Sequence, residues 1–368
     1  MTKLTNRLTS FVNSTTSAVV LVSVSAMLVS FFNWGLGLIF GAIMVRKVGE
    51  AAQERNFKIN YPLVGASGYI GFMVWHAGIS GSAPLKVAES GHLASLMQGI
   101  STVNVPDLIP TSATIFSWWN LVLVAVILVA VPITLKYIAK RSQPTKIPEF
   151  SLMGNEGGEE EASGKLDTSR VLTLLFGGLL LTTFFVQYFE QIQQFILTPN
   201  MLNFFMFGLG ILLHGTFKNY LNALKEAIGG ASGILIQFPL YFGIMGVMKD
   251  TGMVTMISNA FVSISNETTL PIFAFFSAGL VNIFVPSGGG QWAVQGPIIV
   301  ESALQLGVPL NKMIMALAYG DQITNMLQPF WALPLLAITK LKAREILPYT
   351  VIIMLVGSAV YLLGLWLL

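Results

Sequence analysis

The chain contains no cysteine among its 368 residues, so disulfide bonds and thiolate metal sites are excluded. Charged residues are also scarce: they make up 10% of the chain against 54% hydrophobic residues. The mean hydropathy of +0.71 excludes an ordinary soluble domain. The apolar runs do not alternate with polar residues, as the strands of a membrane β-barrel would. These absences leave an all-α polytopic membrane protein.

Long apolar runs predict seven full crossings of the membrane. They cover residues 61–84, 117–137, 171–190, 199–215, 228–248, 310–338 and 346–367. Two further apolar regions, 16–45 and 256–302, are each interrupted in the middle by glycine-rich polar sequence. We interpret both regions as re-entrant hairpins, which enter and leave the membrane on the same side.

This arrangement sorts the basic residues onto the two sides of the membrane. One side holds only Lys86, Lys249 and Lys312. The other side holds Lys3, Arg7, Arg46, Lys47, Arg55, Lys58, Lys136, Lys140, Arg141, Lys146, Lys165, Arg170, Lys218, Lys225, Lys340, Lys342 and Arg344. Because positive residues are retained in the cytoplasm, the second side is predicted to be cytoplasmic. The chain is therefore expected to be a multi-pass protein of the cell (cytoplasmic) membrane, with its C-terminus outside.

A weak internal repeat relates the two halves of the chain. Residues 25–32 resemble residues 277–284, and residues 80–85 align with residues 330–335 at nearly the same offset. An odd number of crossings separates the two hairpins, so they enter from opposite sides, which is the inverted-repeat plan of secondary transporters. We therefore divide the chain into a first repeat (1–137), a linker (138–170) and a second repeat (171–368). The second repeat has crossings before its hairpin and the first has none. Either the halves are unequal or upstream helices are missing from the first, and we expect the second case.

The linker, 138–170, is hydrophilic and contains a cluster of glutamates between glycines and serines (Glu156, Glu159, Glu160 and Glu161). This composition predicts a flexible cytoplasmic tether between the halves, with a regulatory role as the alternative.

Four interruptions of the apolar runs could converge on one site. They are Asn33–Gly37 in hairpin one, Gly78–Pro84 in the crossing at 61–84, Pro286–Trp292 in hairpin two, and Asn325–Pro329 in the crossing at 310–338. Backbone groups exposed at membrane depth are costly unless protein or a polar ligand meets them. Helix N-termini at such breaks offer N–H donors to an anion, and the carbonyls suit a small cation.

Candidate substrate-binding residues come from these breaks. They are Asn33, Trp34, Gly35, Gly37, Ser80, Gly81, Ser82, Ser287, Gly288, Gly289, Gly290, Gln291, Trp292, Asn325 and Gln328. Glycines in membrane helices also serve close helix packing, which is the alternative for Gly35 and Gly37. The serines could instead only bond carbonyls one turn back in their own helices.

Asp321 is the only acidic residue well inside a predicted crossing. An intramembrane carboxylate indicates a proton relay or a cation ligand, so Asp321 and Gln322 are candidates for ion coupling by H⁺ or Na⁺. His76 could titrate near neutral pH, although a satisfied buried histidine is the commoner case. Trp34, Trp75, Trp292 and Trp331 could line an apolar cavity or serve as interfacial anchors.

No lysine or arginine lies inside any predicted crossing. A dianion would be hard to desolvate without one, so the site suits a small monocarboxylate or a neutral solute. The three scattered histidines do not form a metal cluster, and no cofactor, resident metal or nucleic-acid partner is expected. The chain also lacks His-Glu-x-x-His, a Gly-x-Ser-x-Gly elbow and paired aspartates on adjacent crossings, which argues against an enzyme.

The motifs Pro286–Trp292 with Ala293–Pro297, Ala318–Gln322 and Gln328–Pro334 closely resemble the short-chain fatty acid transporter family. Asn33–Gly37 and Gly78–Leu85 are similar to the same family, and the resemblance covers essentially the whole chain. It implies uptake of acids such as acetoacetate or butyrate, coupled to an ion, and a mobile domain that carries the hairpins against a scaffold. Members of the family generally carry further hydrophobic sequence upstream, and they tend to have Glu in place of Asp321.

The sequence therefore predicts a secondary active transporter that imports short-chain fatty acids by alternating access within the lipid bilayer. A transporter of another small organic acid or metabolite is the first alternative. An intramembrane enzyme or a non-transporting subunit is the second. A homo-oligomer is compatible with the sequence.

Overall fold

The computed structural model describes residues 7–98, 104–150, 166–194, 196–253, 256, 259–260, 263–328 and 330–367. These residues form helices and connecting turns, with no strand in the described ranges. The chain divides into two compact units, one of residues 1–148 with 238–368 and one of residues 149–237. The structure is thus all-α, as predicted.

The first unit contains both hairpins and both broken crossings. Its helices are α2 (Thr15–Phe32), α3 (Trp34–Glu54), α4 (Tyr61–Tyr69), η1 (Ile70–Met73), α5 (Ser82–Lys86), α6 (His92–Met97), η2 (Thr111–Ala113), α7 (Trp118–Arg141), α13 (Leu270–Phe284), α14 (Gly288–Leu306), α15 (Leu310–Thr324), η3 (Asn325–Leu327), α16 (Leu333–Thr339) and α17 (Ala343–Leu367). The second unit contains α8 (Arg170–Gln187), α9 (Phe189–Gln193) and α10 (Pro199–His214), and α11 (Phe217–Asp250) begins in it.

Hairpin one turns on a single residue. Asn33 is extended (φ −152°, ψ 123°) and ends α2, and its Oδ1 accepts the N–H of Leu36 at 2.9 Å to cap α3. The two arms approach closely next to this turn, because a Cβ on Gly37 would overlap Ser30. Gly37 therefore has the packing role that the sequence left open.

Hairpin two turns over Val285–Ser287. Pro286 cannot donate a hydrogen bond to α13, and the Ser287 Oγ accepts the N–H of Gly290 at 3.3 Å to cap α14. The expectation of a non-helical break through Pro286–Trp292 was therefore wrong, because the three glycines already form the first turn of α14. Of the predicted hairpin range, residues 257–258 and 261–262 lie outside the described residues.

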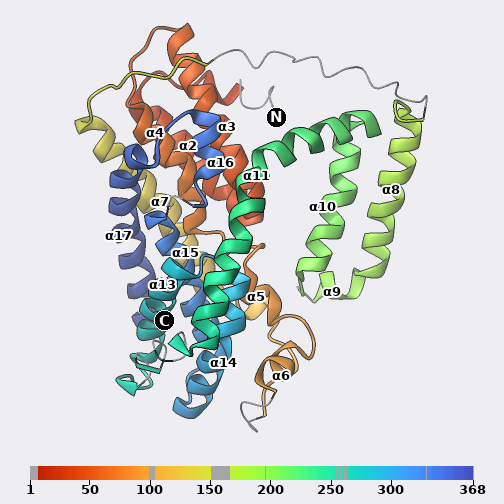
Figure 1. Ribbon diagram of the computed structural model, residues 1–368, viewed down its shortest axis with the longest axis vertical. Helices are drawn as coiled ribbons and strands as arrows, with labels where there is room; N and C mark the ends of the chain where they lie inside the picture. The colour runs from red at the N-terminus through yellow and green to blue at the C-terminus, as the bar shows by residue number, and fades with distance from the viewer. Residues whose placement is uncertain are drawn as a thin grey trace. The chain divides into compact units, whose positions relative to one another are not determined.

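The two halves of the first unit pack in matching ways. Arm α2 packs on α4 and η1, and arm α13 packs on α15 and η3. Across the halves, α3 packs on α16 and α14 packs on α5. Figure 1 shows α17 running beside α7, and these two helices follow the two broken segments in the chain.

The broken crossings are interrupted close to the predicted positions. The first is helical to Met73, irregular to Gly81 and helical again from Ser82, so its break begins earlier than the predicted Gly78 and ends before Pro84. The second passes through the 3-10 turn η3, and its helix resumes at Leu333. Pro329, part of this predicted break, lies outside the described residues.

The predicted flexible linker is ordered at its start. Helix α7 continues to Arg141, and the N–H of Thr145 then donates to the carbonyl of Ile59 at 3.0 Å. The Thr145 Oγ1 accepts the N–H of Tyr61, also at 3.0 Å. Residues 142–148 are therefore bound to the α3–α4 turn rather than free, because these bonds satisfy backbone groups at the start of α4. The glutamate cluster lies in 151–165, outside the described residues.

In the second unit, α8 and α10 pack against each other (Figure 1). Gly215, in the left-handed region (φ 73°), ends α10, and the chain turns by 113° into the start of α11. The predicted crossing at 228–248 is the later part of α11, a continuous helix of 34 residues.

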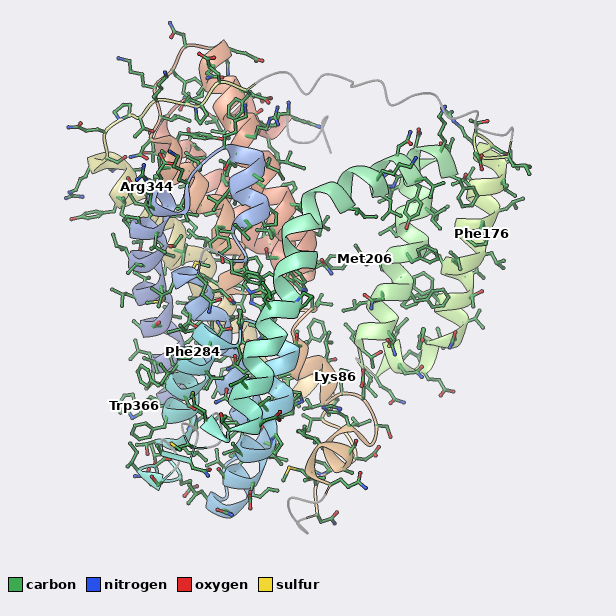
Figure 2. The ribbon with its side chains drawn as sticks, viewed as in Figure 1. Lys86, Phe176, Met206, Phe284, Arg344 and Trp366 are labelled. Carbon is green, nitrogen blue, oxygen red and sulfur yellow. The ribbon has the colours of Figure 1, made fainter. Side chains whose placement is uncertain are left out.

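Apolar side chains cover exposed helix surfaces, as lipid contact requires. Trp366 near the end of α17 and Phe284 at the end of α13 are exposed (Figure 2). In the described ranges, four helices are long and apolar enough to cross a membrane: α2, α7, α8 and α17. A bent pair formed by α10 and the start of α11 would make five. Helix α2 is long enough to cross the whole membrane, whereas a re-entrant arm would enter and leave on the same side. The re-entrant course of hairpin one therefore stays a prediction.

Candidate functional site

The tip of hairpin one binds to the break in the first broken crossing. The N–H of Ile79 donates to the carbonyl of Phe31 at 2.7 Å, and the N–H of Trp34 donates to the Ser80 Oγ at 2.9 Å. Ser80 therefore satisfies a free donor at the start of α3, instead of bonding a carbonyl of its own helix.

The tip of hairpin two lies against the same break. A Cβ built on Gly288 would lie 2.8 Å from Trp75 Cη2, 3.0 Å from His76 Cε1 and 3.1 Å from Ser82 Oγ. A larger residue would not fit there without displacing these side chains. Both hairpin tips thus meet residues 75–82, and the proximity of hairpin two depends on the absence of a side chain at Gly288.

The fourth break is held by hydrogen bonds to two other elements, α4 and α13. The hydroxyl of Tyr69 donates to the carbonyls of Asn325 (3.0 Å) and Gln328 (3.1 Å), and the Gln328 Nε2 donates to the carbonyl of Asn282 at 2.6 Å. The Asn282 Nδ2 in turn donates to the carbonyl of Asp321 at 2.8 Å. These bonds connect the fourth break to α4 of the first broken crossing and to α13 of hairpin two.

Asn282 was not among the predicted site residues, although it is fully buried at the centre of this network. A signal for it existed: Asn282 is the polar residue within the apolar run 277–284, and it occupies the place of Ser30 in the internal repeat. Tyr69 carried no such signal, because its partners lie more than 250 residues away along the chain.

His76 and Asp321 form a buried pair between the two halves. The His76 Nδ1 lies 3.4 Å from the Asp321 Oδ2, and both side chains are at most 1% exposed. The His76 Nε2 accepts the N–H of Ala83 at 3.1 Å, so a neutral imidazole carries its proton on Nδ1, which faces the carboxylate. Gln322 strengthens the same contact, since its Oε1 accepts the N–H groups of His76 (2.9 Å) and Ala77 (3.1 Å).

Several buried polar atoms at the breaks have no hydrogen-bond partner among the described residues. They are Ser30 Oγ, Trp75 Nε1, His76 Nδ1, Asn282 Oδ1, Gln291 Oε1, Asp321 Oδ2, Gln322 Nε2, Asn325 Nδ2 and Gln328 Oε1. Each such group costs about 1–3 kcal/mol unless a ligand or water satisfies it. Their gathering around the convergent breaks indicates a site for a polar ligand. The described part of the chain holds no group of three or more His, Asp or Glu suited to a metal ion.

Aromatic rings line one side of these breaks. The ring of Trp34 lies 5.1 Å from that of Trp331 and 6.1 Å from that of Phe72, measured between centroids. Trp75 lies 6.3 Å from Trp34. Trp292 has a different environment, because its Nε1 donates to the His92 Nε2 on α6 at 2.9 Å. Three of the four predicted tryptophans thus form one cluster, and the fourth binds α6.

The remaining predicted residues have separate roles. Gly81 is packed against the carbonyl of His76, whereas Gly289 is exposed, and a Cβ built on it would meet no atom within 4 Å. Gly35 and Gly290 are half-buried in the first turns of α3 and α14. The Gln291 Nε2 donates to the carbonyl of Ala278 at 2.8 Å, which links the two arms of hairpin two.

Apolar helices, broken segments and paired hairpins define the class of this protein: it is a multi-pass α-helical membrane protein. Its fold is similar to that of the YdaH transporter of Alcanivorax borkumensis, with a TM-score of 0.52 at 12% sequence identity over 99% of this chain and 80% of that chain.

The family profile described as "Short chain fatty acid transporter" matches residues 1–368, and the chain belongs to this family. A relative from Escherichia coli K12, provisionally named a short-chain fatty acid transporter, is 37% identical over 92% of this chain and 77% of its own length. A relative from Haemophilus influenzae with the same provisional name is 32% identical over 100% of this chain and 82% of its own. The family consists of transporters and not enzymes, as the sequence predicted.

Proposed function

We propose that this chain is a secondary active transporter that moves short-chain monocarboxylates such as acetoacetate or butyrate across the cell membrane by alternating access. The observation that carries the proposal is the meeting of both hairpin tips at residues 75–82, beside buried polar groups that lack partners. The described residues include no buried lysine or arginine, so the site favours a monoanion over a dianion.

The matching contacts of the two halves support an inverted repeat with two re-entrant hairpins. Each hairpin packs on the broken segment of its own half, and its second arm packs on the resumed helix of the other half. In transporters built from inverted repeats, alternating access is a movement of one set of elements against the other around the site.

We further propose that the coupling ion is a proton shared by Asp321 and His76. Asp321 is 1% exposed, and its Oδ2 lies 3.4 Å from the Nδ1 of His76. Uncharged polar groups complete the surroundings: Gln322 and Asn282 bond the adjacent backbone, and the hydroxyl of Tyr361 donates to the carbonyl of Met73. Carboxylates inside a membrane protein commonly mark ion pathways and proton relays, which is the role proposed for Asp321.

The test is uptake of labelled butyrate by proteoliposomes that contain the wild-type chain. An inward proton gradient should drive accumulation, and an inward sodium gradient alone should not. Uptake that needs sodium at every pH would reassign Asp321 to a cation site. Absence of butyrate and acetoacetate uptake, together with uptake of another small acid, would overturn the substrate assignment.

The residue-level test is Asp321→Asn, with Glu301→Gln as the control. Glu301 lies on α14 near its end and accepts from the Gln305 Nε2 at 3.3 Å, away from the breaks. Asp321→Asn should abolish the pH dependence of uptake, and Glu301→Gln should preserve it. Retained pH dependence in Asp321→Asn would exclude Asp321 as the proton carrier.

A further inference from the structure

Trp75 lies between the two hairpin tips. Its ring meets Trp34 of hairpin one edge-on at 6.3 Å, and its Cη2 lies next to Gly288 of hairpin two. It stacks on His76 at 4.5 Å, and the side chain is 6% exposed. From the sequence, Trp75 was only a candidate lining residue or anchor, so its place between the tips comes from the tertiary structure.

The indole Nε1 of Trp75 is buried and has no hydrogen-bond partner among the described residues. An indole N–H can only donate, so this group needs an acceptor that the described residues do not supply. Trp292 provides an internal comparison, because its equally buried N–H does have a protein acceptor, the His92 Nε2 at 2.9 Å. The difference indicates that the acceptor for Trp75 arrives from outside the fold.

The aromatic neighbours of Trp75 offer an apolar surface beside this donor. Phe72 lies 6.2 Å from Trp75 and stacks on Trp331 at 5.8 Å, and Trp331 meets Trp34 at 5.1 Å. Aromatic faces of this kind accommodate aliphatic groups and exclude water from them. Because the rings of this set are bulky and lie close together, the length of an alkyl group that fits among them is limited.

We propose that the indole N–H of Trp75 donates a hydrogen bond to the carboxylate of the transported acid, while the faces of Trp34, Phe72 and Trp331 hold its short alkyl chain. This inference rests on the proposed function and names the residues that select the substrate. The ligand class is a monocarboxylate with an apolar tail of a few carbons. The N–H donor favours a charged carboxylate over a neutral acceptor, and the rings select against long chains.

The first test is Trp75→Phe, which keeps an aromatic ring and removes the N–H. Loss of one hydrogen bond to a charged group should raise KM for butyrate about 10- to 100-fold, equivalent to about 1.4–2.7 kcal/mol. Trp118→Phe is the matched control, because Trp118 is 67% exposed at the start of α7, and its KM should match that of the wild type. A KM for Trp75→Phe within twofold of wild type would overturn the role of the N–H.

A second measurement uses the wild-type chain, so it does not depend on the folding of a variant. The protein has 7 tryptophans, and ¹⁵N-indole labelling gives each one a signal that single substitutions can assign. Butyrate should move the Trp75 indole N–H signal downfield and leave that of Trp118 in place. An unchanged Trp75 signal at saturating butyrate would overturn the proposal and assign water as the acceptor.

The variant Trp331→Leu tests the proposal that the aromatic rings limit the alkyl chain length of the substrate. Removing one ring should raise the kcat/KM ratio of hexanoate to butyrate at least several-fold, and equal effects on both acids would overturn this part. Failure of the proposed function is distinguishable, since the wild-type protein would then show neither butyrate uptake nor butyrate binding.

Discussion

Replacing Gly288 by alanine tests whether hairpin two functions by docking closely on the first broken crossing. A Cβ at this position would lie 2.8 Å from Trp75 Cη2 and 3.0 Å from His76 Cε1. The two rings stack on each other at 4.5 Å, so neither is the free end of a flexible chain. Gly289 is the natural control, because a Cβ there would meet no atom within 4 Å.

The size of the expected loss of transport follows from comparing Gly288→Ala with Gly289→Ala. Both glycines lie in the first turn of α14 with the same Ser287 cap, so the gain in helix propensity, about 1 kcal/mol, is shared by both variants. Only Gly288→Ala adds an overpacking cost, which is about 1–3 kcal/mol for an inserted methyl group in a packed site. This cost falls on the docked arrangement, and it corresponds to about a 5- to 150-fold shift away from that arrangement.

The assay is initial-rate butyrate uptake in proteoliposomes, normalised to the amount of folded transporter recovered by size-exclusion chromatography. Gly288→Ala should reduce the rate by about 5- to 150-fold, and Gly289→Ala should stay within about twofold of the wild type. Equal rates in the two variants would refute the reasoning, whether both were normal or both impaired. In the first case the contact would not matter to transport, and in the second the glycines would be needed for flexibility instead of space.

Two further predictions concern packing and pH. Gly320→Ala should lower the thermal midpoint in detergent, because its Cβ would overlap the backbone carbonyl of Phe275, at an overpacking cost of about 1–3 kcal/mol. Gly178→Ala on α8, where a Cβ meets nothing within 4 Å, should be neutral or slightly stabilising, and similar losses in both variants would contradict the packing argument. Burial, and then a neighbouring lysine, hold the pKa of His92, in the segment between two predicted crossings, below its usual 6.5. A pKa lowered by folding means that the bond from Trp292 stabilises the protein above about pH 6.5 and is lost as the pH falls through the lowered pKa. Thermal unfolding from pH 8 to pH 5 should therefore show a stability loss that is smaller in His92→Gln, and parallel profiles would exclude His92 as its source.

Much of the architecture was accessible from the sequence because the membrane restricts what a chain can do. Without water to satisfy backbone groups, apolar runs must be helical, and every proline- or glycine-rich interruption must be met by protein or ligand. The positions of the hairpins and of the broken crossings followed from this constraint, as did the transporter class. The residues after Pro286 show where this inference from composition fails. The three glycines suggested a loop, but the Ser287 side chain caps a helix whose first turn they form.

The site depends on which segments of the chain contact each other, and local composition does not predict those contacts. Ser80 looked like a residue that could bond its own helix, yet it accepts from the tip of hairpin one, 46 residues away. The sequence marked Asp321 as a functional carboxylate, but only the tertiary structure placed the Nδ1 of His76 beside it. The sequence marked Trp292 as a candidate binding residue and Trp75 only as a lining residue or an anchor. Among the described residues, however, the indole N–H of Trp292 has an acceptor and that of Trp75 has none. The sequence alone thus determined helices, breaks and charge, because these depend on near neighbours and on the bilayer. The tertiary structure decided which donors and acceptors remain open to a ligand, because that depends on contacts between residues far apart in the chain, such as Trp34 with Ser80 and His76 with Gln322.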